Sequence, residues 1–145
     1  MILFTIGYEN HSTRSLFDLL RVHGVRFLAD VRAYPISNRE DMSAGELRLL
    51  CKTHGMIYRD YGGLGVPASL RRQIRISRNF DLLRNEYPKL LDRREKGLGF
   101  LRDLVVANKG RVCLFCYEYN PAQCHRSILA QRLKGMVPGL TITDL

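Results

Sequence analysis

The segment from residue 116 to residue 126 holds the densest group of side chains that could take part in chemistry. Within eleven residues it contains two cysteines, a carboxylate, a histidine and an arginine: Cys116, Glu118, Cys124, His125 and Arg126. The apolar run at 112–115 predicts a buried strand, and apolar residues at helical spacing predict a helix from about residue 124. The segment would therefore join a strand to a helix N-terminus, a position that favours anion binding and a lowered thiol pKa.

Each reactive side chain of this segment has a chemical and a structural interpretation. Cys124 could be a nucleophile, because a helix N-terminus and a nearby arginine favour its thiolate, or it could be a small buried or capping residue. His125 could act as a general base or donate to an anion, or it could pack within the first helical turn. Glu118 could transfer a proton or interact with the helix dipole. Cys116 ends the predicted strand and is expected to be buried.

Metal and redox chemistry are the other uses of clustered cysteine and histidine. Cys116, Cys124 and His125 supply suitable ligand atoms, and His11 could complete a tetrahedral set. The spacing is not a paired C-x-x-C arrangement, however, and adjacent Cys and His side chains rarely point at one ion. We therefore predict no metal site, and the sequence indicates no particular cofactor. A redox pair of Cys116 and Cys124 stays open, because sequence separation does not decide it.

Polar segments follow four predicted strands, which span residues 2–7, 25–31, 56–59 and 111–117. In open parallel sheets, ligands bind outside the carboxyl ends of the strands, so these segments could share one cleft. Planar guanidinium groups suit phosphate or carboxylate best. The anion-binding candidates are His11, Ser12, Arg32, Ser37, Arg39, Tyr58 and Arg126. Asp30 could pair with Arg32 or orient a catalytic group, so it joins Cys124, His125 and Glu118 as a catalytic candidate.

Helices expected between the strands complete an alternating pattern. Ser43 and Glu46 have the form of a capping box at the start of one helix. Pro88 is expected to interrupt any helix through the 80s, with a long helix from about 90 to 105 beyond it. The alternation predicts one three-layer α/β domain over residues 1–145, with a mostly parallel sheet of about five strands and helices on both faces.

The charge balance points to an anionic partner. A formal net charge of +9 attracts nucleotides or nucleic acids. The arginines at 71–78 could follow a phosphate backbone, although a solvated helix face is the default interpretation of such a stretch. No apolar run reaches the length of a membrane span, and the first residues lack the features of a signal peptide. We therefore expect a cytoplasmic protein without a membrane partner.

Four motifs, taken in order, resemble the family named domain of unknown function 488. They are Thr5-Ile6-Gly7-Tyr8 with His11-Ser12, Asp30-Val31-Arg32 with Pro35 and Ser37, Tyr58 before Leu64-Gly65, and Cys116-x-Glu118-x-x-Pro121-x-x-Cys124-His125-Arg126. The chain departs from the family at Asp60, where members often have a histidine. The resemblance implies a compact α/β domain with a cleft like an active site. It makes the motif residues candidates for that site and supplies no reaction.

These observations give one leading hypothesis and two alternatives. The leading hypothesis is an enzyme that acts on a phosphate-bearing substrate, a nucleotide or nucleic acid, with Arg32, Arg39 and Arg126 holding the anion. The first alternative is a non-catalytic nucleic-acid-binding module that uses the basic stretch at 71–78. The second is a thiol redox or metal-binding protein that uses Cys116 and Cys124.

Overall fold

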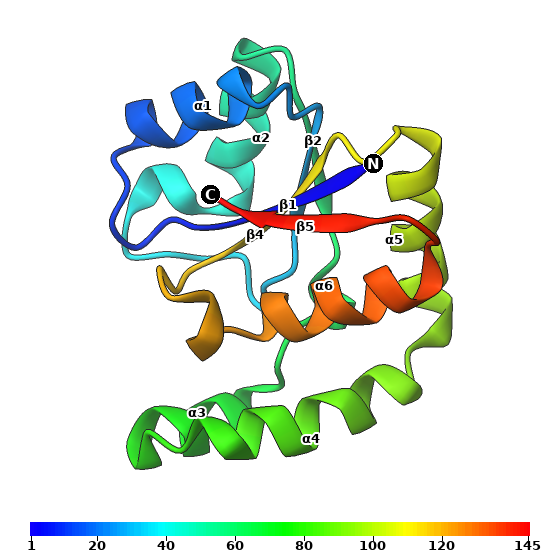
Figure 1. Cartoon of the computed structure of the whole chain (residues 1–145). Coiled ribbons are helices and arrows are strands. Elements are labelled where there is room, and N and C mark those ends of the chain that lie inside the picture. The colour runs from blue at the N-terminus through cyan, green and yellow to red at the C-terminus, as the bar shows by residue number, and fades with distance from the viewer.

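One sheet of five strands forms the centre of the computed structural model, which describes all 145 residues (Figure 1). The strands are β1 (Ile2–Gly7), β2 (Phe27–Asp30), β3 (Ile57–Asp60), β4 (Val112–Cys116) and β5 (Thr141–Asp144). Their order across the sheet is β3-β2-β4-β1-β5, and every neighbouring pair is parallel. The predicted α/β class is confirmed, and the sheet is parallel throughout.

Six helices cover the two faces of the sheet. They are α1 (Thr13–Val22), α2 (Ala44–Thr53), α3 (Ala68–Ser77), α4 (Phe80–Asp92), α5 (Glu95–Ala107) and α6 (His125–Met136). The helices α1 and α2 pack on one face, and the other four lie on the opposite side (Figure 1). None of the six combines enough length with enough apolar character to cross a membrane.

The strand β4 is buried along its whole length because it lies in the middle of the sheet, with helices on both sides. Its side chains alternate between the two hydrophobic cores: Cys113 and Phe115 face α1 and α2, whereas Leu114 and Cys116 face the other helices. This alternation follows from the two-residue period of a strand. The edge strand β5 is mostly exposed.

Three sequence expectations about helices were wrong. The hydroxyl of Ser43 does not cap α2; instead it accepts a hydrogen bond from the backbone N–H of Ser37, at 3.0 Å. Pro88 lies inside α4, and the long helix expected after it is divided between α4 and α5. A proline inside a helix costs about 3 kcal/mol. Burial of Leu83, Tyr87 and Leu91 on one face of α4 offsets this cost, because each large apolar side chain contributes about 1.5–3 kcal/mol.

The carboxyl ends of β2, β4 and β1 lie side by side, and this edge is where the polar segments gather. In the register of the sheet, Asp30 is opposite Phe115 and Gly7 is opposite Cys116. A Cβ atom on Gly7 would lie 1.7 Å from the carbonyl oxygen of Glu118. Glycine is therefore required for the segment after β4 to cross the end of β1 so closely.

Candidate active site

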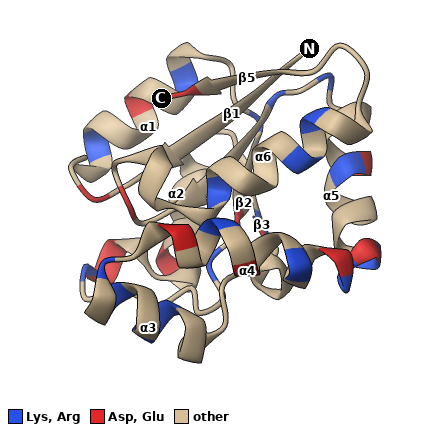
Figure 2. Ribbon diagram, turned by 60° about the horizontal axis from the view of Figure 1, so that its bottom comes forward, with Lys and Arg blue, Asp and Glu red and all other residues tan.

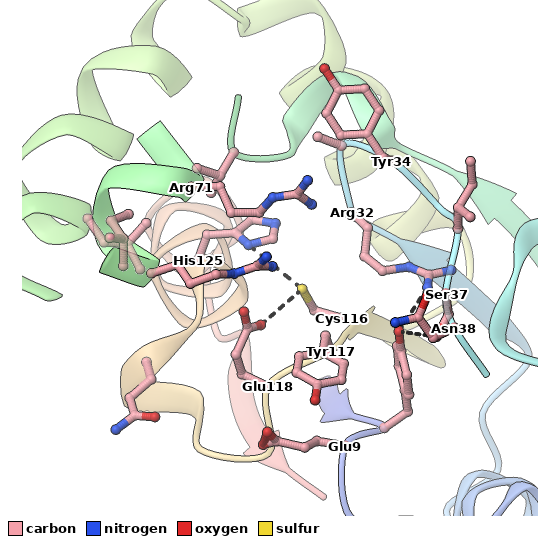
Figure 3. Close-up of a pocket in the computed structure, with 18 of the residues that line it drawn as sticks. Glu9, Arg32, Tyr34, Ser37, Asn38, Arg71, Cys116, Tyr117, Glu118 and His125 are labelled. Atoms are coloured by element: carbon pink, nitrogen blue, oxygen red, sulfur yellow. Dashed lines mark hydrogen bonds between the residues drawn. The ribbon is translucent and has the colours of Figure 1, made fainter. Parts of the chain in front are cut away.

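A cleft of about 690 Å³ opens at the carboxyl ends of β1, β2 and β4. Its floor contains Cys116, Glu118 and His125, and Figure 3 shows the sulfur of Cys116 linked by dashed lines to the other two side chains. The segment after β2 and helix α3 form its walls. The wall after β2 includes Arg32, Tyr34, Ser37 and Arg39, and the α3 wall includes Arg71, Arg75 and Arg78.

The thiol, imidazole and carboxylate of the floor form a compact cluster with a second thiol, that of Cys124. The Nδ1 atom of His125 lies 3.8 Å from the Sγ of Cys116 and 3.9 Å from the Sγ of Cys124. The other ring nitrogen, Nε2, lies 2.7 Å from the carbonyl oxygen of Val31 and donates to it. Glu118 Oε2 lies 3.5 Å from Cys116 Sγ. Cys124 lies behind this group and does not line the cleft.

The two thiols and the imidazole of the cluster shift one another's pKa values. Burial raises the pKa of Cys124, but interactions with Cys116 and His125 outweigh it, and the pKa lies well below its ordinary value. Burial lowers the pKa of His125, but the Cys124 thiolate beside it raises that pKa overall. The two shifts favour a thiolate at Cys124 beside a charged His125 imidazole. The interaction with Cys124, together with burial, raises the pKa of Cys116, so Cys116 stays a thiol.

Glu118 is half-buried and its backbone is held in place by Arg126. Burial, and to a smaller extent the charge of Cys124, raise the pKa of Glu118 to about 7. The guanidinium of Arg126 donates to the carbonyl oxygens of Glu118, at 2.5 Å, and Tyr119, at 3.3 Å. Its Nε donates to Thr5 Oγ1, at 3.1 Å. Arg126 is 1% exposed and fixes the segment that carries the carboxylate.

Asp30 and Arg32 form a buried ion pair beneath the wall after β2. The Nε and Nη2 atoms of Arg32 donate to the two carboxylate oxygens of Asp30, at 2.9 and 2.7 Å. The hydroxyl of Tyr58 donates to the same carboxylate, at 2.6 Å. The guanidinium also lies over the rings of Tyr8 and Phe115, 5.4 and 5.0 Å from their centroids. Most of the binding capacity of Arg32 is therefore used within the protein.

Arg39 is likewise fixed by internal partners. Its Nη1 donates to the carbonyl oxygens of Tyr8, at 3.0 Å, and His11, at 2.7 Å, which ties the segments after β1 and β2 together. Ser37 Oγ accepts hydrogen bonds from the Tyr8 hydroxyl and from the backbone N–H of Arg39. The wall after β2 is thus a connected and rigid structure.

The arginines of the α3 wall, in contrast, are not held by hydrogen bonds or ion pairs within the protein. The helix carries three arginines and no acidic residue (Figure 2). Arg71, Arg75 and Arg78 are exposed, and no hydrogen bond or ion pair holds their side chains. The guanidinium of Arg71 lies 5.4 Å from the ring centroid of Tyr34 across the cleft. These arginines are available to a ligand.

Only some of the candidate residues from the sequence lie in this cleft. Those that line it are His125, Glu118, Arg32, Ser37 and Arg39. Those that do not are Cys124, Asp30, His11, Ser12, Tyr58 and Arg126. Of the second group, Asp30, Tyr58 and Arg126 hold neighbouring groups in place, and Ser12 caps α1 by accepting from the backbone N–H of Ser15. The ring nitrogen Nε2 of His11 is buried without a hydrogen-bond partner.

Two parts of the cleft were not among the site residues predicted from the sequence. Cys116 is buried as predicted, yet it also lines the floor. The arginines of α3 were interpreted by default as a solvated face. The spacing of Arg71 and Arg75 by four residues places them on one side of α3, and Arg78 follows as the residue after the last helical turn, whereas Arg72 does not line the cleft. That spacing was the signal that could have found them.

Comparison with known proteins gives one match. The family model described as Domain of unknown function DUF488 matches residues 12–133 of the 145-residue chain. The matched range includes the floor and the α3 wall of the cleft. No curated protein and no solved structure matches the chain.

Proposed function

The chain belongs to the family described as domain of unknown function 488, and we propose that it is an enzyme that acts on a phosphate-bearing substrate, a nucleotide or nucleic acid, in the cleft. One observation carries this proposal. Exposed arginines without acidic partners stand opposite a floor that combines a carboxylate, a thiol and an imidazole.

The α3 wall supports recognition of phosphate. A guanidinium donates two parallel hydrogen bonds to a phosphate, and three guanidinium groups, those of Arg71, Arg75 and Arg78, line this wall of the cleft. The cleft volume of about 690 Å³ is in the range of small-molecule and cofactor sites, about 300–1,000 Å³. No hydrogen bond or ion pair holds Arg71, Arg75 or Arg78, so a ligand would compete only with the contacts of Arg71 with the Tyr34 ring and of Arg78 with the Phe80 ring.

The floor supports catalysis rather than binding alone. Glu118 lines the cleft beside Cys116 and His125, so a bound substrate would have a group for proton transfer within reach. Cys116 is the thiol that lines the cleft, whereas Cys124 lies behind it and would act on the substrate only through its neighbours.

A non-catalytic nucleic-acid-binding module is the second candidate function. The basic stretch on which that hypothesis rested now forms the α3 wall, so both functions would use the same cleft. Turnover is therefore the property that separates them. We also propose a cytoplasmic location, because all four cysteines are free and two of them lie close together, as suits a reducing compartment.

The test is a turnover assay on a panel of mononucleotides and single-stranded oligonucleotides, with chromatography to detect products. We expect conversion of at least one compound, and a loss of at least about 100-fold in kcat for Glu118→Gln with nearly unchanged substrate affinity. The matched control is Glu9→Gln, because Glu9 is an exposed carboxylate that also lines the cleft. Binding without conversion of any compound would contradict the enzyme and favour the binding module. Equal turnover in both variants would remove Glu118 from the mechanism.

A further inference from the structure

We propose that Cys116, Cys124 and His125 form a zinc site whose fourth position is open to the cleft. The inference goes beyond the proposed function, because zinc binding is a property of the protein without substrate. It rests on the geometry, burial and chemistry of three side chains that the fold brings together from β4 and the start of α6.

The three ligand atoms already have nearly the spacing that zinc requires. The two sulfur atoms and Nδ1 of His125 all lie within 4.8 Å of one another. Tetrahedral bonds of about 2.3 Å to sulfur and about 2.05 Å to nitrogen would separate sulfur from nitrogen by about 3.6 Å. The separations here are 3.8 Å for Cys116 and 3.9 Å for Cys124. Relative to Nδ1, each sulfur atom would move by only a few tenths of an ångström on coordination.

The orientation of His125 matches that of a metal ligand. Its Nε2 donates to the carbonyl oxygen of Val31 at 2.7 Å, and this bond turns Nδ1 toward both sulfur atoms. Metal-bound histidines commonly donate their second ring N–H to a carbonyl or carboxylate, which fixes the ring and its tautomer. The sequence-based objection that adjacent Cys and His side chains rarely point at one ion does not hold in this geometry.

The donor set favours zinc over harder cations. Binding of the ion would release the thiol proton of Cys116 and any proton on Nδ1 of His125 to solvent. The resulting two thiolates and imidazole suit Zn²⁺, whereas Mg²⁺ and Ca²⁺ prefer oxygen ligands. The three side chains are only 4%, 2% and 6% exposed for Cys116, Cys124 and His125, so little water competes for the site. The fourth ligand considered from the sequence, His11, is not part of this cluster.

The free side of the cluster faces the cleft. Cys116 and His125 line the cleft, and Cys124 lies behind them. Three protein ligands with an open fourth position are typical of catalytic zinc sites, whereas structural sites have four protein ligands. Glu118 lies beside the open side, with Oε2 at 3.5 Å from Cys116 Sγ (Figure 3). An ion held here would present its open position to a ligand bound against the α3 wall.

The test measures metal binding by the full, reduced protein after removal of metal with a chelator and without any substrate. We expect one Zn²⁺ per chain by elemental analysis. Competition with a chromophoric chelator should show that Cys116→Ala and Cys124→Ala each lower the affinity for Zn²⁺ at least about 100-fold. This loss exceeds the typical effect of removing a residue that only hydrogen-bonds to a metal ligand, which is about 10- to 100-fold. The matched control is Cys113→Ala, because Cys113 is a buried thiol of the same strand that faces the other core. This variant should keep the affinity of the unmodified protein.

A second measurement on the unmodified protein covers the case in which a cysteine variant does not fold. Co²⁺ added to the reduced protein should give the visible spectrum of a tetrahedral ion and the absorption of cobalt–thiolate bonds. The zinc site would be overturned by any of three results. These are absence of the Co²⁺ spectrum, zinc affinity that survives loss of Cys116 or Cys124, and a loss of affinity in Cys113→Ala as large as in those variants. Because no substrate is present, failure here leaves the proposed turnover to its own assay.

Discussion

The two arginine walls of the cleft differ in what already holds their side chains. Arg32, in the wall after β2, is 6% exposed and bound through two nitrogens to Asp30. Arg75, in the α3 wall, is exposed and has no ion pair or hydrogen bond. The same residue type thus has two roles. An arginine with buried internal partners shapes the site, whereas an arginine without partners is free to bind a ligand.

The contrast changes which arginines are expected to recognise substrate. The sequence pointed to Arg32, Arg39 and Arg126, because each follows a strand end or belongs to a motif. All three donate to groups of the protein itself. In the proposed function, recognition would therefore fall to the α3 wall, with the wall after β2 as a rigid surface against which a ligand is held.

The largest expected effect is a loss of stability when the buried ion pair beneath the wall after β2 is removed. Asp30→Ala would leave the buried guanidinium of Arg32 without its carboxylate and the hydroxyl of Tyr58 without its acceptor. We expect the free energy of unfolding to fall by about 3–5 kcal/mol, because one partner of a buried pair is removed. Denaturant-induced unfolding, followed by circular dichroism, measures this change.

The control for this prediction is Asp81→Ala, which removes the acid of the exposed Arg84–Asp81 pair on α4. It should cost about 1 kcal/mol or less. Similar small losses in both variants would show that the Asp30–Arg32 pair does not stabilise the wall.

A smaller effect, on ligand affinity, is expected from the contact between Tyr34 in the wall after β2 and Arg71 in the α3 wall. Tyr34→Leu removes the aromatic ring over which the guanidinium of Arg71 lies. Such a contact contributes about 0.5–1 kcal/mol, so affinity for a labelled oligonucleotide should fall about 2- to 5-fold. Tyr119→Leu is the control, because Tyr119 has a similarly exposed ring outside the cleft. Fluorescence anisotropy titrations compare the two, and an equal loss in both would argue against a role for the Tyr34–Arg71 contact.

Much of the fold could be predicted from local patterns. The apolar runs that became β1 and β4 predicted buried strands because such runs are buried on both faces of a parallel sheet. The continuation of α4 through Pro88 could not be predicted, because it depends on burial of Leu83, Tyr87 and Leu91 against distant elements. Helix propensities describe isolated helices and do not include the stabilisation from this burial.

The candidate site was predictable in position but not in detail. The strand ends located the cleft, because the carboxyl ends of parallel strands share one edge of the sheet. Whether a side chain lines the cleft or supports it depends on its direction and partners. Tyr58 and Arg126 follow or border strand ends, yet both bind the protein itself. The spacing of Arg71 and Arg75 indicates a shared helix face, but that this face borders the cleft comes from packing between distant segments.

The most direct test of the account compares two arginines of the same helix. Affinity for a fluorescein-labelled single-stranded oligonucleotide is measured over a series of salt concentrations for Arg75→Ala and Arg72→Ala. We expect Arg75→Ala to weaken binding by at least about 10-fold, because a charge-assisted hydrogen bond contributes about 1.5–3 kcal/mol. It should also reduce the slope of log K against log salt by about 0.7. Arg72→Ala, outside the cleft, should leave affinity and slope nearly unchanged. Equal effects of the two substitutions would mean that binding follows general surface charge, and would contradict recognition by the α3 wall of the cleft.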